Sequence, residues 1–288
     1  MKRQDFRFLD RLRVRWSEVD MQKIVFNGHY LNYFDSAVAG YWRALALPYE
    51  ATMAQLQGDL FVRKATLEYL GSARYDEICE VGMRCSRIGN SSMVFTAALF
   101  RGDVCLVHGE LVYVFADPHS QTSRPVPLAL RDVLEAFEAG QTMFNMRLGD
   151  WGELGAVAQP LRHAVFVQEQ KIPAPLEGDN TDTLCLHAVA SNRLGTPIAT
   201  GRLAVAVAMA GQSKIGRMAV LPALRGSGVG RAVLQALVAA ARERGDSEVL
   251  LHAQTSAANF YRRSGFVPRG PGFDEAGIAH QAMVLALR

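Results

Sequence analysis

Residues 214–230, with the sequence KIGRMAVLPALRGSGVG, constrain the fold of this chain more than any other segment. The apolar run 215–221 predicts a strand, and residues 225–230 (RGSGVG) follow it as a glycine-rich turn. An apolar-striped helix is expected from about residue 231 to residue 244. This order leaves free backbone N–H groups at the positive end of a helix dipole, which is an arrangement that binds phosphate.

The glycine turn by itself does not identify its ligand. It lacks the Gly-Lys-Ser/Thr ending of a Walker loop and the G-x-G-x-x-G spacing of a dinucleotide-binding loop. An ordinary strand–turn–helix connection fits the same residues. A second apolar strand at 248–253 (EVLLHA), followed by residues 258–266 (ANFYRRSGF), narrows the choice.

These two motifs resemble the GNAT N-acetyltransferase superfamily. The R-x-x-G-x-G pattern is similar to its coenzyme A pyrophosphate loop, and the second motif is similar to the A-x-x-F-Y-x-x-x-G-F element that closes the coenzyme A site. The resemblance implies transfer of an acetyl group from acetyl-CoA to an amine, with Tyr261 as general acid beside the sulfur and Asn259 bonded to pantetheine. The resemblance further implies that the pantetheine chain of coenzyme A pairs with the backbone of a strand edge at Met218, Ala219 and Val220. It also implies that the pyrophosphate is bound by the glycine turn, which consists of Arg225, Gly226, Ser227, Gly228, Val229 and Gly230. A packed aromatic with an incidental hydroxyl is the alternative for Tyr261.

Further motifs point to one branch of that superfamily. Residues 162–170 (RHAVFVQEQ) and 273–280 (FDEAGIAH), with Asp182 and His187, resemble ElaA-type GNAT proteins over about residues 142–288. Groups that line an acceptor pocket or act as base are offered by Glu169, Glu275 and His280, although each taken alone is more often structural. His187 and His252 lie inside apolar strand runs, where a satisfied core histidine is the default interpretation.

The first half of the chain predicts a separate two-layer unit. Residues 6–17 alternate as a strand does, and Leu31, Phe34, Val38, Tyr41 and Leu45 form a helical stripe that ends at Pro48. Strand-like runs follow at 60–70, 77–88, 92–101 and 104–116, with turn residues between successive runs. One long helix against an antiparallel meander is a stable α+β arrangement.

The boundary between the halves is expected near residue 140. A polar stretch with three prolines, 117–127 (DPHSQTSRPVP), precedes a short helix at 128–138, which gives domains at 1–140 and 141–288. The second half then predicts an α/β unit. Its elements are a strand near 142–148, a helix at 152–168, strands near 184–190, 197–207 and 213–221, the two motifs above, and a last strand near 280–287.

Residues 13–20 (RVRWSEVD) and 24–31 (IVFNGHYL) resemble the YbgC/4-hydroxybenzoyl-CoA thioesterase family of the hot-dog fold, and the resemblance covers most of residues 8–138. It implies that Asp20 acts as nucleophile or general base on an acyl-CoA thioester, while the N-terminus of the long helix polarises the carbonyl. Lys23 stands where the family usually has glycine, and Asn27 where one branch has histidine. An aspartate that caps a turn is the alternative for Asp20.

Composition excludes several partners and compartments. The net charge is only +3 and no dense basic patch occurs, so we expect no nucleic acid partner. No run approaches the roughly 18 apolar residues that span a bilayer, and the N-terminal residues lack the apolar core of a secretory signal. No C-x-x-C spacing joins the four cysteines, so we expect free thiols, a cytoplasmic location and no metal. The cysteines are Cys79, Cys85, Cys105 and Cys185.

The sequence therefore predicts a bifunctional acyl-CoA enzyme, with a hydrolase in the first half and an N-acetyltransferase in the second. Acyl-CoA and an amine acceptor are the expected partners. A homo-oligomer through the hot-dog half is also expected, because a lone helix covers one face of its sheet and leaves edges to be paired. Two alternatives stay open: a single transferase whose hot-dog half only dimerises, and an acyl-CoA sensor without turnover.

Overall fold

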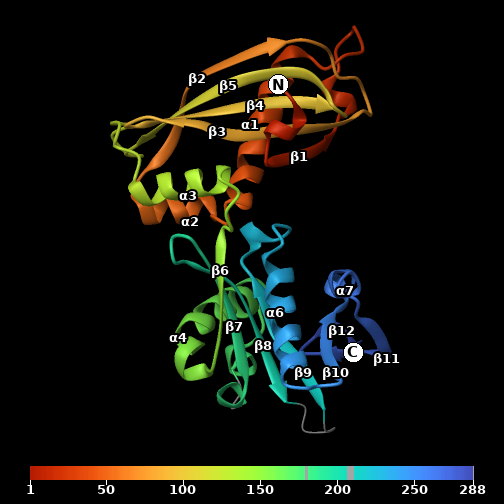
Figure 1. The fold of residues 1–288 in the computed structure, drawn as a ribbon. Coiled ribbons are helices and arrows are strands. Elements are labelled where there is room, and N and C mark those ends of the chain that lie inside the picture. Colours follow the sequence, from red (N-terminus) through yellow and green to blue (C-terminus); the bar gives the residue numbers. More distant parts are fainter. Residues whose placement is uncertain (179–180, 206–210, 288) are drawn as a thin grey trace. The chain divides into compact units, whose positions relative to one another are not determined.

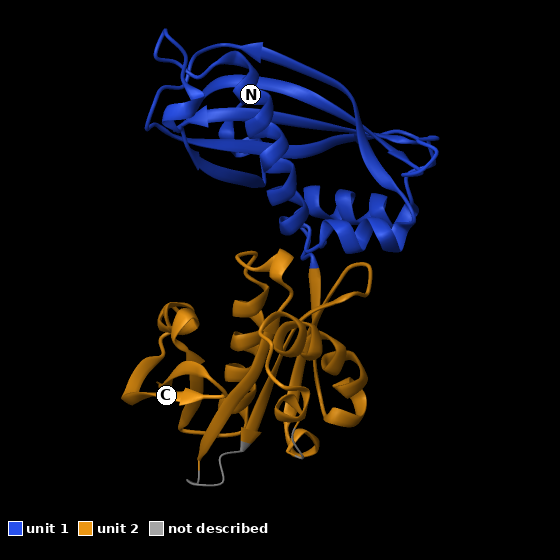
Figure 2. Cartoon of the chain, turned by 180° about the vertical axis from the view of Figure 1, so that it is seen from behind, with its two compact units in different colours: residues 1–143 blue, residues 144–288 orange. Residues whose placement is uncertain are grey.

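The computed structural model describes residues 1–178, 181–205 and 211–287. The chain divides into two compact units, Met1–Met143 and Phe144–Arg288, which are coloured separately in Figure 2. Of the strand expected near 197–207, the described part ends at Val205, and its last two positions lie outside the described residues.

The first unit is built on one antiparallel sheet of five strands in the order β1-β3-β4-β5-β2 (Figure 1). Because β1 and β2 lie at the two edges, each has one backbone edge that no described strand pairs. The strands are β1 (Phe8–Arg13), β2 (Asp59–Tyr69), β3 (Ile78–Ile88), β4 (Ser92–Arg101) and β5 (Val104–Ala116).

Helix α1 (Asn27–Ala44) packs against β1, β3 and β4 and forms the second layer of this unit. Phe34 and Tyr41 are completely buried, as their spacing predicts. Leu31, expected on the same stripe, is exposed, because the buried face of the helix is centred on Tyr30 and Ala37 instead. Two shorter helices complete the unit: α2 (Tyr49–Leu56), which the sequence did not predict, and α3 (Leu128–Glu138), which lies where expected.

The second unit contains a sheet of seven strands in the order β11-β12-β10-β9-β8-β7-β6. All neighbouring pairs are antiparallel except β9 and β10. The strands are β6 (Phe144–Gly149), β7 (Leu186–Asn192), β8 (Pro197–Val205), β9 (Gln212–Val220), β10 (Glu248–Gln254), β11 (Val267–Glu275) and β12 (Ile278–Ala286).

The helices of the second unit lie beside this sheet and carry several of the sequence motifs (Figure 1). Helix α4 (Trp151–Arg162) runs directly into a π-helix (His163–Glu169), and the two together occupy the single helix expected at 152–168. Helix α5 (Ala174–Glu177) is short, and α7 (Ala258–Arg262) carries the Phe-Tyr motif. Helix α6 (Val229–Glu243) packs on β7, β8 and β9 and begins two residues earlier than expected, inside the glycine turn.

A tight turn in the first unit places Lys23 in the left-handed region, with a φ of 62°. The turn is closed by an Asp20 N–H to Ile24 O hydrogen bond of 2.9 Å and by a Lys23 N–H to Asp20 O bond of 2.9 Å. A residue with a Cβ in this conformation costs about 1–2 kcal/mol, which glycine avoids. The backbone at position 23 therefore has a conformation that glycine would adopt without strain.

We expect Lys23→Gly to stabilise the first unit by about 0.5–1 kcal/mol, because relief of the left-handed strain exceeds the extra chain entropy that glycine loses on folding. The matched control is Lys64→Gly, which removes the same side chain from an exposed position of strand β2 and should destabilise the unit. Native-state hydrogen exchange of peptides from residues 1–143 measures the change for this unit alone. A loss of protection in Lys23→Gly would contradict the strain argument.

Candidate functional sites

Asp20 lies in the turn that precedes helix α1. Its Oδ1 accepts the Gln22 N–H at 2.8 Å, so the carboxylate does cap its own turn, as the alternative interpretation expected. No described residue hydrogen-bonds its second oxygen, Oδ2. Val19 and Val25 pair across the turn, and α1 begins at Asn27 just after this bridge. The turn thus holds a half-buried carboxylate, with one open oxygen, close in sequence to the start of an 18-residue helix.

The start of α1 offers backbone donors. No side chain caps this end of the helix. The His29 N–H donates to the Phe26 carbonyl at 2.9 Å, so the open donors of the first turn are the N–H groups of Asn27 and Gly28. Glu18, which the sequence analysis did not single out, is a second carboxylate near Asp20. Its Oε2 accepts hydrogen bonds from the Tyr33 hydroxyl at 2.7 Å and from the Arg15 N–H at 2.7 Å, so it braces the turn. Burial, together with this carboxylate, raises the pKa of Tyr33 well above its ordinary value, so the hydroxyl stays a donor.

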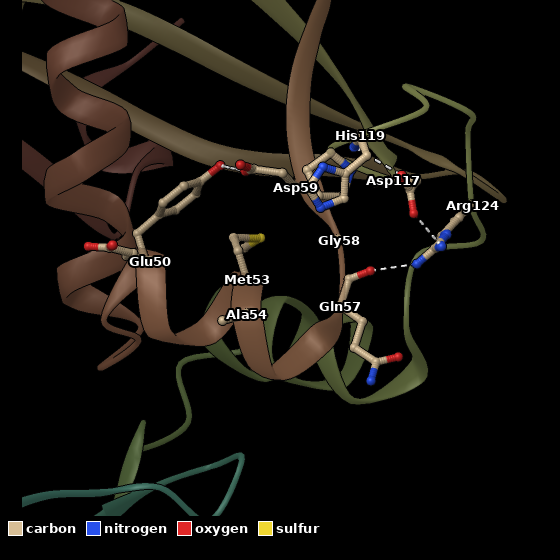
Figure 3. A pocket seen from close by; sticks show the side chains of 11 residues that line it. Glu50, Met53, Ala54, Gln57, Gly58, Asp59, Asp117, His119 and Arg124 are labelled. Carbon is tan, nitrogen blue, oxygen red and sulfur yellow. Dashed lines mark hydrogen bonds and ion pairs between the residues drawn. The ribbon is translucent and has the colours of Figure 1, made fainter.

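A separate hollow of about 530 Å³ lies where α2 meets the ends of β2 and β5. Figure 3 shows Arg124 facing Asp117 on one side of the hollow and Glu50 on the other side. Arg124 donates to Asp117 at 2.5 Å and to the carbonyl of Gln57 at 2.6 Å, and the Tyr49 hydroxyl donates to Asp59 at 2.5 Å. Asp20 does not line this hollow. Arg124, Asp117 and Asp59 are thus paired within the hollow, and none of the sequence motifs above contributes a residue to its lining.

In the second unit, the local geometry favours glycine at three positions of the turn, two because of their backbone conformation and one because of close packing. Gly226 and Gly228 have φ values of 83° and 93°, which side chains rarely allow. Gly228 is also the N-cap of α6, so the helix starts directly from this left-handed turn. A Cβ on Gly230 would lie 3.0 Å from a methyl of Val220, which shows that the third glycine lets the helix pack closely on β9.

Arg225 does not point its charge freely at this turn. Its guanidinium forms a bidentate ion pair with Glu169 of the π-helix, at 2.6 and 2.7 Å. Both side chains are largely exposed, so the pair is open to exchange with an incoming anion. The backbone donors at the start of α6 are therefore the fixed part of the candidate phosphate site, and the arginine is a movable part. The Oγ of Ser227 is buried and has no hydrogen-bond partner among the described residues.

Strands β9 and β10 separate in the middle of the sheet. Their parallel pairing ends at Ile215 and Leu251, whereas β9 stays paired with β8 up to Val220. At Arg217, with a φ of 51°, the register of β9 on β8 shifts by a bulge. The edge of β9 that would face β10 therefore has no described strand opposite Met218, Ala219 and Val220.

The separation opens a cavity of about 620 Å³. Met218 lines it from β9, and Tyr261 lines it from α7. The Tyr261 side chain is almost fully buried, and burial raises its pKa to about 12, so the hydroxyl keeps its proton at neutral pH. Asn259 does not line the cavity: it is exposed, and its amide oxygen accepts a hydrogen bond from Arg262 at 3.0 Å. The structure thus brings together the strand edge and the tyrosine, but not the asparagine.

A buried ion network supports one wall of this cavity. The Arg162 side chain is 1% exposed and donates hydrogen bonds to Glu177 and, at 2.9 Å, to Asp182. Asp182 also accepts a hydrogen bond from Arg202 at 2.7 Å. Burial alone would raise the pKa of Asp182, but the two guanidinium groups outweigh it and hold that pKa below its ordinary value. Nε2 of His187 donates a hydrogen bond to the carbonyl of Asp182 at 2.9 Å and the side chain is buried, so it is a satisfied core histidine as expected.

The other histidine does not follow that default. His252 lines the cavity together with Glu275 and His280, and its imidazole is hydrogen-bonded to Glu275 at 3.0 Å. The apolar neighbours of His252 in β10 favour a core position, but only Leu251 and Ala253 on either side of it are buried, and His252 lies on the opposite, partly open face. The sequence signal for that face is the period of two in a strand, which places His252 on the same side as the polar residues Glu248 and Gln254.

Two general findings concern the described part of the chain. No group of three or more His, Cys, Asp or Glu residues is arranged there to hold a metal ion. None of the helices described is long and apolar enough to cross a membrane.

Comparison with known proteins agrees with this division into two units. Residues 22–107 match the family model of the thioesterase superfamily, and residues 188–287 match the model of the acetyltransferase (GNAT) domain. YjcF of Bacillus subtilis, which is named an uncharacterized N-acetyltransferase, is 36% identical over 125 residues, which are 43% of this chain and 86% of that protein. The acyl-CoA thioester hydrolase YbgC of Escherichia coli O6:H1 is 26% identical over 120 residues, 41% of this chain and 89% of that protein.

Among solved structures, Escherichia coli ElaA is 28% identical to this chain, with a TM-score of 0.45. The match covers 49% of this chain and 99% of ElaA. The matches to YjcF and to the acetyltransferase model fall on the unit that contains the glycine turn and Tyr261. Those to YbgC and to the thioesterase model fall on the unit that contains Asp20. The chain belongs to the GNAT acetyltransferase family through its second unit, and its first unit is a hot-dog domain of the thioesterase superfamily.

Proposed function

We propose that the protein is a bifunctional acyl-CoA enzyme, which transfers an acetyl group from acetyl-CoA to an amine in the second unit and hydrolyses acyl-CoA in the first. The observation that carries the proposal is the cavity between β9 and β10. An unpaired strand edge and Tyr261 lie around this parting of the sheet, and the glycine turn at the start of α6 follows a few residues after that edge. An extended pantetheine chain can pair with such an edge as an added strand does.

In the second unit, coenzyme A would bind with its pyrophosphate on the backbone N–H groups of Gly226 and of residues 228–230, because the Ser227 N–H already donates to the Leu224 carbonyl at 3.2 Å. Arg225 would leave Glu169 to join the phosphates, because a charge-assisted pair with a dianion is stronger than an exposed salt bridge. The pantetheine chain would extend along Met218, Ala219 and Val220. This places the thioester near Tyr261, whose protonated hydroxyl would donate to the departing thiolate. Asn259 contributes only if the Arg262 contact is exchanged for one with the ligand.

In the first unit, the open oxygen of Asp20 would act on the thioester, either directly or through a water molecule. The free N–H groups at the start of α1 would stabilise the oxyanion that develops on the carbonyl. These steps in both units use side chains and backbone donors alone and require no metal.

The first unit is proposed to associate with a second copy of itself. Strand β2 is an edge strand whose residues are mostly exposed, among them Val62 and Tyr69. An antiparallel edge is self-complementary under two-fold symmetry, so a second copy fits it without any other partner.

A reducing cytoplasm is the proposed location. All four cysteines are free thiols. Burial, the largest cause in each case, raises the pKa of Cys79 to about 11 and that of Cys85 to about 12, so these two thiols are protonated and unreactive.

Tyr261→Phe should lower kcat for amine-dependent transfer by about 10²-fold or more, because it removes the proton donor and keeps the ring. Acetyl-CoA affinity, measured by calorimetry, should change little. Release of coenzyme A thiol is followed with spermidine, 2-phenylethylamine and a peptide with a free N-terminus as acceptors. Tyr75→Phe, an exposed tyrosine of the first unit, is the matched control. Turnover that survives in Tyr261→Phe would make this hydroxyl incidental.

Asp20→Asn should abolish hydrolysis measured without amine, with a loss of about 10²–10⁴-fold, while amine-dependent transfer persists. The two activities are expected to separate because each unit has its own core. Thiol release is measured with short, long and aromatic acyl-CoAs, and Asp132→Asn on an exposed face of α3 is the control. If the unaltered protein hydrolyses none of these, the first unit serves as a dimerisation domain or a sensor. Sizing of the full chain then decides between those two roles.

A further inference from the structure

Three ionisable side chains meet on the wall of the second-unit cavity: Lys214 of β9, His252 of β10 and Glu275 at the end of β11. The Nδ1 atom of His252 lies 3.0 Å from Oε2 of Glu275 and 3.4 Å from Nζ of Lys214. The His252 side chain is 29% exposed, so the ring is neither sealed in the core nor fully solvated. Tyr261 lines the same cavity.

The contact with Glu275 fixes which ring nitrogen of His252 is basic. A carboxylate can only accept a hydrogen bond, so the short contact requires a proton on Nδ1. The lone pair of a neutral imidazole then lies on Nε2, and no described residue hydrogen-bonds that atom. Lys214 would favour the opposite tautomer, but its contact with Nδ1 is the longer of the two. A carboxylate behind the ring also stabilises the imidazolium that forms when Nε2 takes up a proton.

Glu275 is held in place by a rigid turn. Ala276 and Gly277 join β11 to β12 with φ values of 56° and 77°, which is the conformation of a two-residue type I′ hairpin. Asp274 accepts the Gly277 N–H at 2.9 Å and closes the turn. Burial alone would raise the pKa of Glu275, but the hydrogen bond from His252 and nearby positive charge hold it below its ordinary value. The carboxylate is therefore ionised at neutral pH.

We propose that His252 is the general base of the transfer reaction and that Glu275 is a positioning residue for it. This assignment rests on the proposed acetyltransferase function of the same cavity. The nitrogen lone pair of the acceptor amine attacks the acetyl carbonyl carbon, and Nε2 of His252 removes one proton from that nitrogen. The C–N bond forms, the C–S bond breaks, and the thiolate takes the proton of Tyr261. The imidazolium returns its proton to the tyrosine through solvent, which leaves an N-acetylated amine and free coenzyme A thiol.

His280 is the rival for this role because it lines the same cavity. Its Nδ1 lies 2.7 Å from the carbonyl of Ile278 on its own strand, and its ring stacks on Phe273. A neutral carbonyl orients a ring as a carboxylate does, but it gives less stabilisation to a positive charge. The geometry therefore favours His252.

Labelling with bromoacetyl-CoA tests the assignment without knowledge of the natural amine. The Asp20→Asn full chain is used, so that the first unit does not hydrolyse the reagent. The reagent should alkylate Nε2 of His252, with formation of an N–C bond and loss of bromide, and excess acetyl-CoA should protect it. Peptide mass spectrometry locates the label. Label on His280 instead, or none on His252 although calorimetry shows acetyl-CoA bound, would overturn the proposal and leave the transferase function intact. No binding of acetyl-CoA would overturn the proposed function itself.

Steady-state kinetics with whichever of the three amines named above is acetylated fastest provides a second, independent test. His252→Gln should lower kcat by about 10²-fold or more with little change in the KM for acetyl-CoA. Glu275→Gln should give a smaller loss of kcat and slower labelling of His252, an effect on the reactivity of another residue that a merely structural role would not produce. His163→Gln, an exposed histidine at the start of the π-helix, is the unchanged control. Full activity in His252→Gln, with activity lost in His280→Gln, would refute the assignment.

Discussion

The parallel pairing of β9 with β10 stops at Ile215 and Leu251, and the chemistry proposed for the second unit depends on that break. Because β9 continues to pair with β8 up to Val220, the strand stays in the sheet while its other edge becomes available. The backbone of Met218, Ala219 and Val220 would otherwise be consumed by the ladder to β10, and no extended ligand could pair with it. The same divergence opens the cavity and lets β10 present His252 from one side and α7 present Tyr261 from another. The glycine turn follows this strand after one short 3-10 helix, Pro222–Leu224, so the phosphate site is held close in sequence to the open strand edge.

The wall of the cavity is stabilised by charge rather than by apolar packing alone. Arg162, at the end of α4, binds Glu177 of α5 and Asp182, and Asp182 also binds Arg202 of β8. Removal of one partner from such a buried network typically costs about 3–5 kcal/mol, because an uncompensated charge stays behind. An apolar replacement of the whole network would be tolerated thermodynamically but would not fix the direction in which each segment leaves the sheet. The network therefore suits a region in which the helix, the short α5 and a strand must keep one relative position around a ligand.

The outline of both units could be predicted from the sequence because it rests on local patterns. The helix at 128–138, the meander of the first unit and the strand–glycine–helix order of the second follow from periodicity and turn residues. Features that depend on tertiary partners could not be predicted. Leu31 lies on the helical stripe but faces solvent, since the angle of α1 on its sheet favours Tyr30 and Ala37. The pairing of Arg225 with Glu169 joins residues 56 positions apart. His252 was assigned to the core because a strand's apolar neighbours do not reveal which face its sheet leaves open.

Both units place a strained residue next to the groups proposed to react. Lys23, three positions after Asp20, has a φ of 62°, and Arg217 and Ala276, which line the cavity of the second unit, have φ values of 51° and 56°. Each such residue costs about 1–2 kcal/mol, which the surrounding hydrogen bonds must offset. Glycine at position 23 would adopt the same backbone conformation, so lysine there changes the charge near Asp20 rather than the path of the chain. An effect of the Lys23 charge on the reactivity proposed for Asp20 would therefore respond to ionic strength in a way that a change in backbone would not.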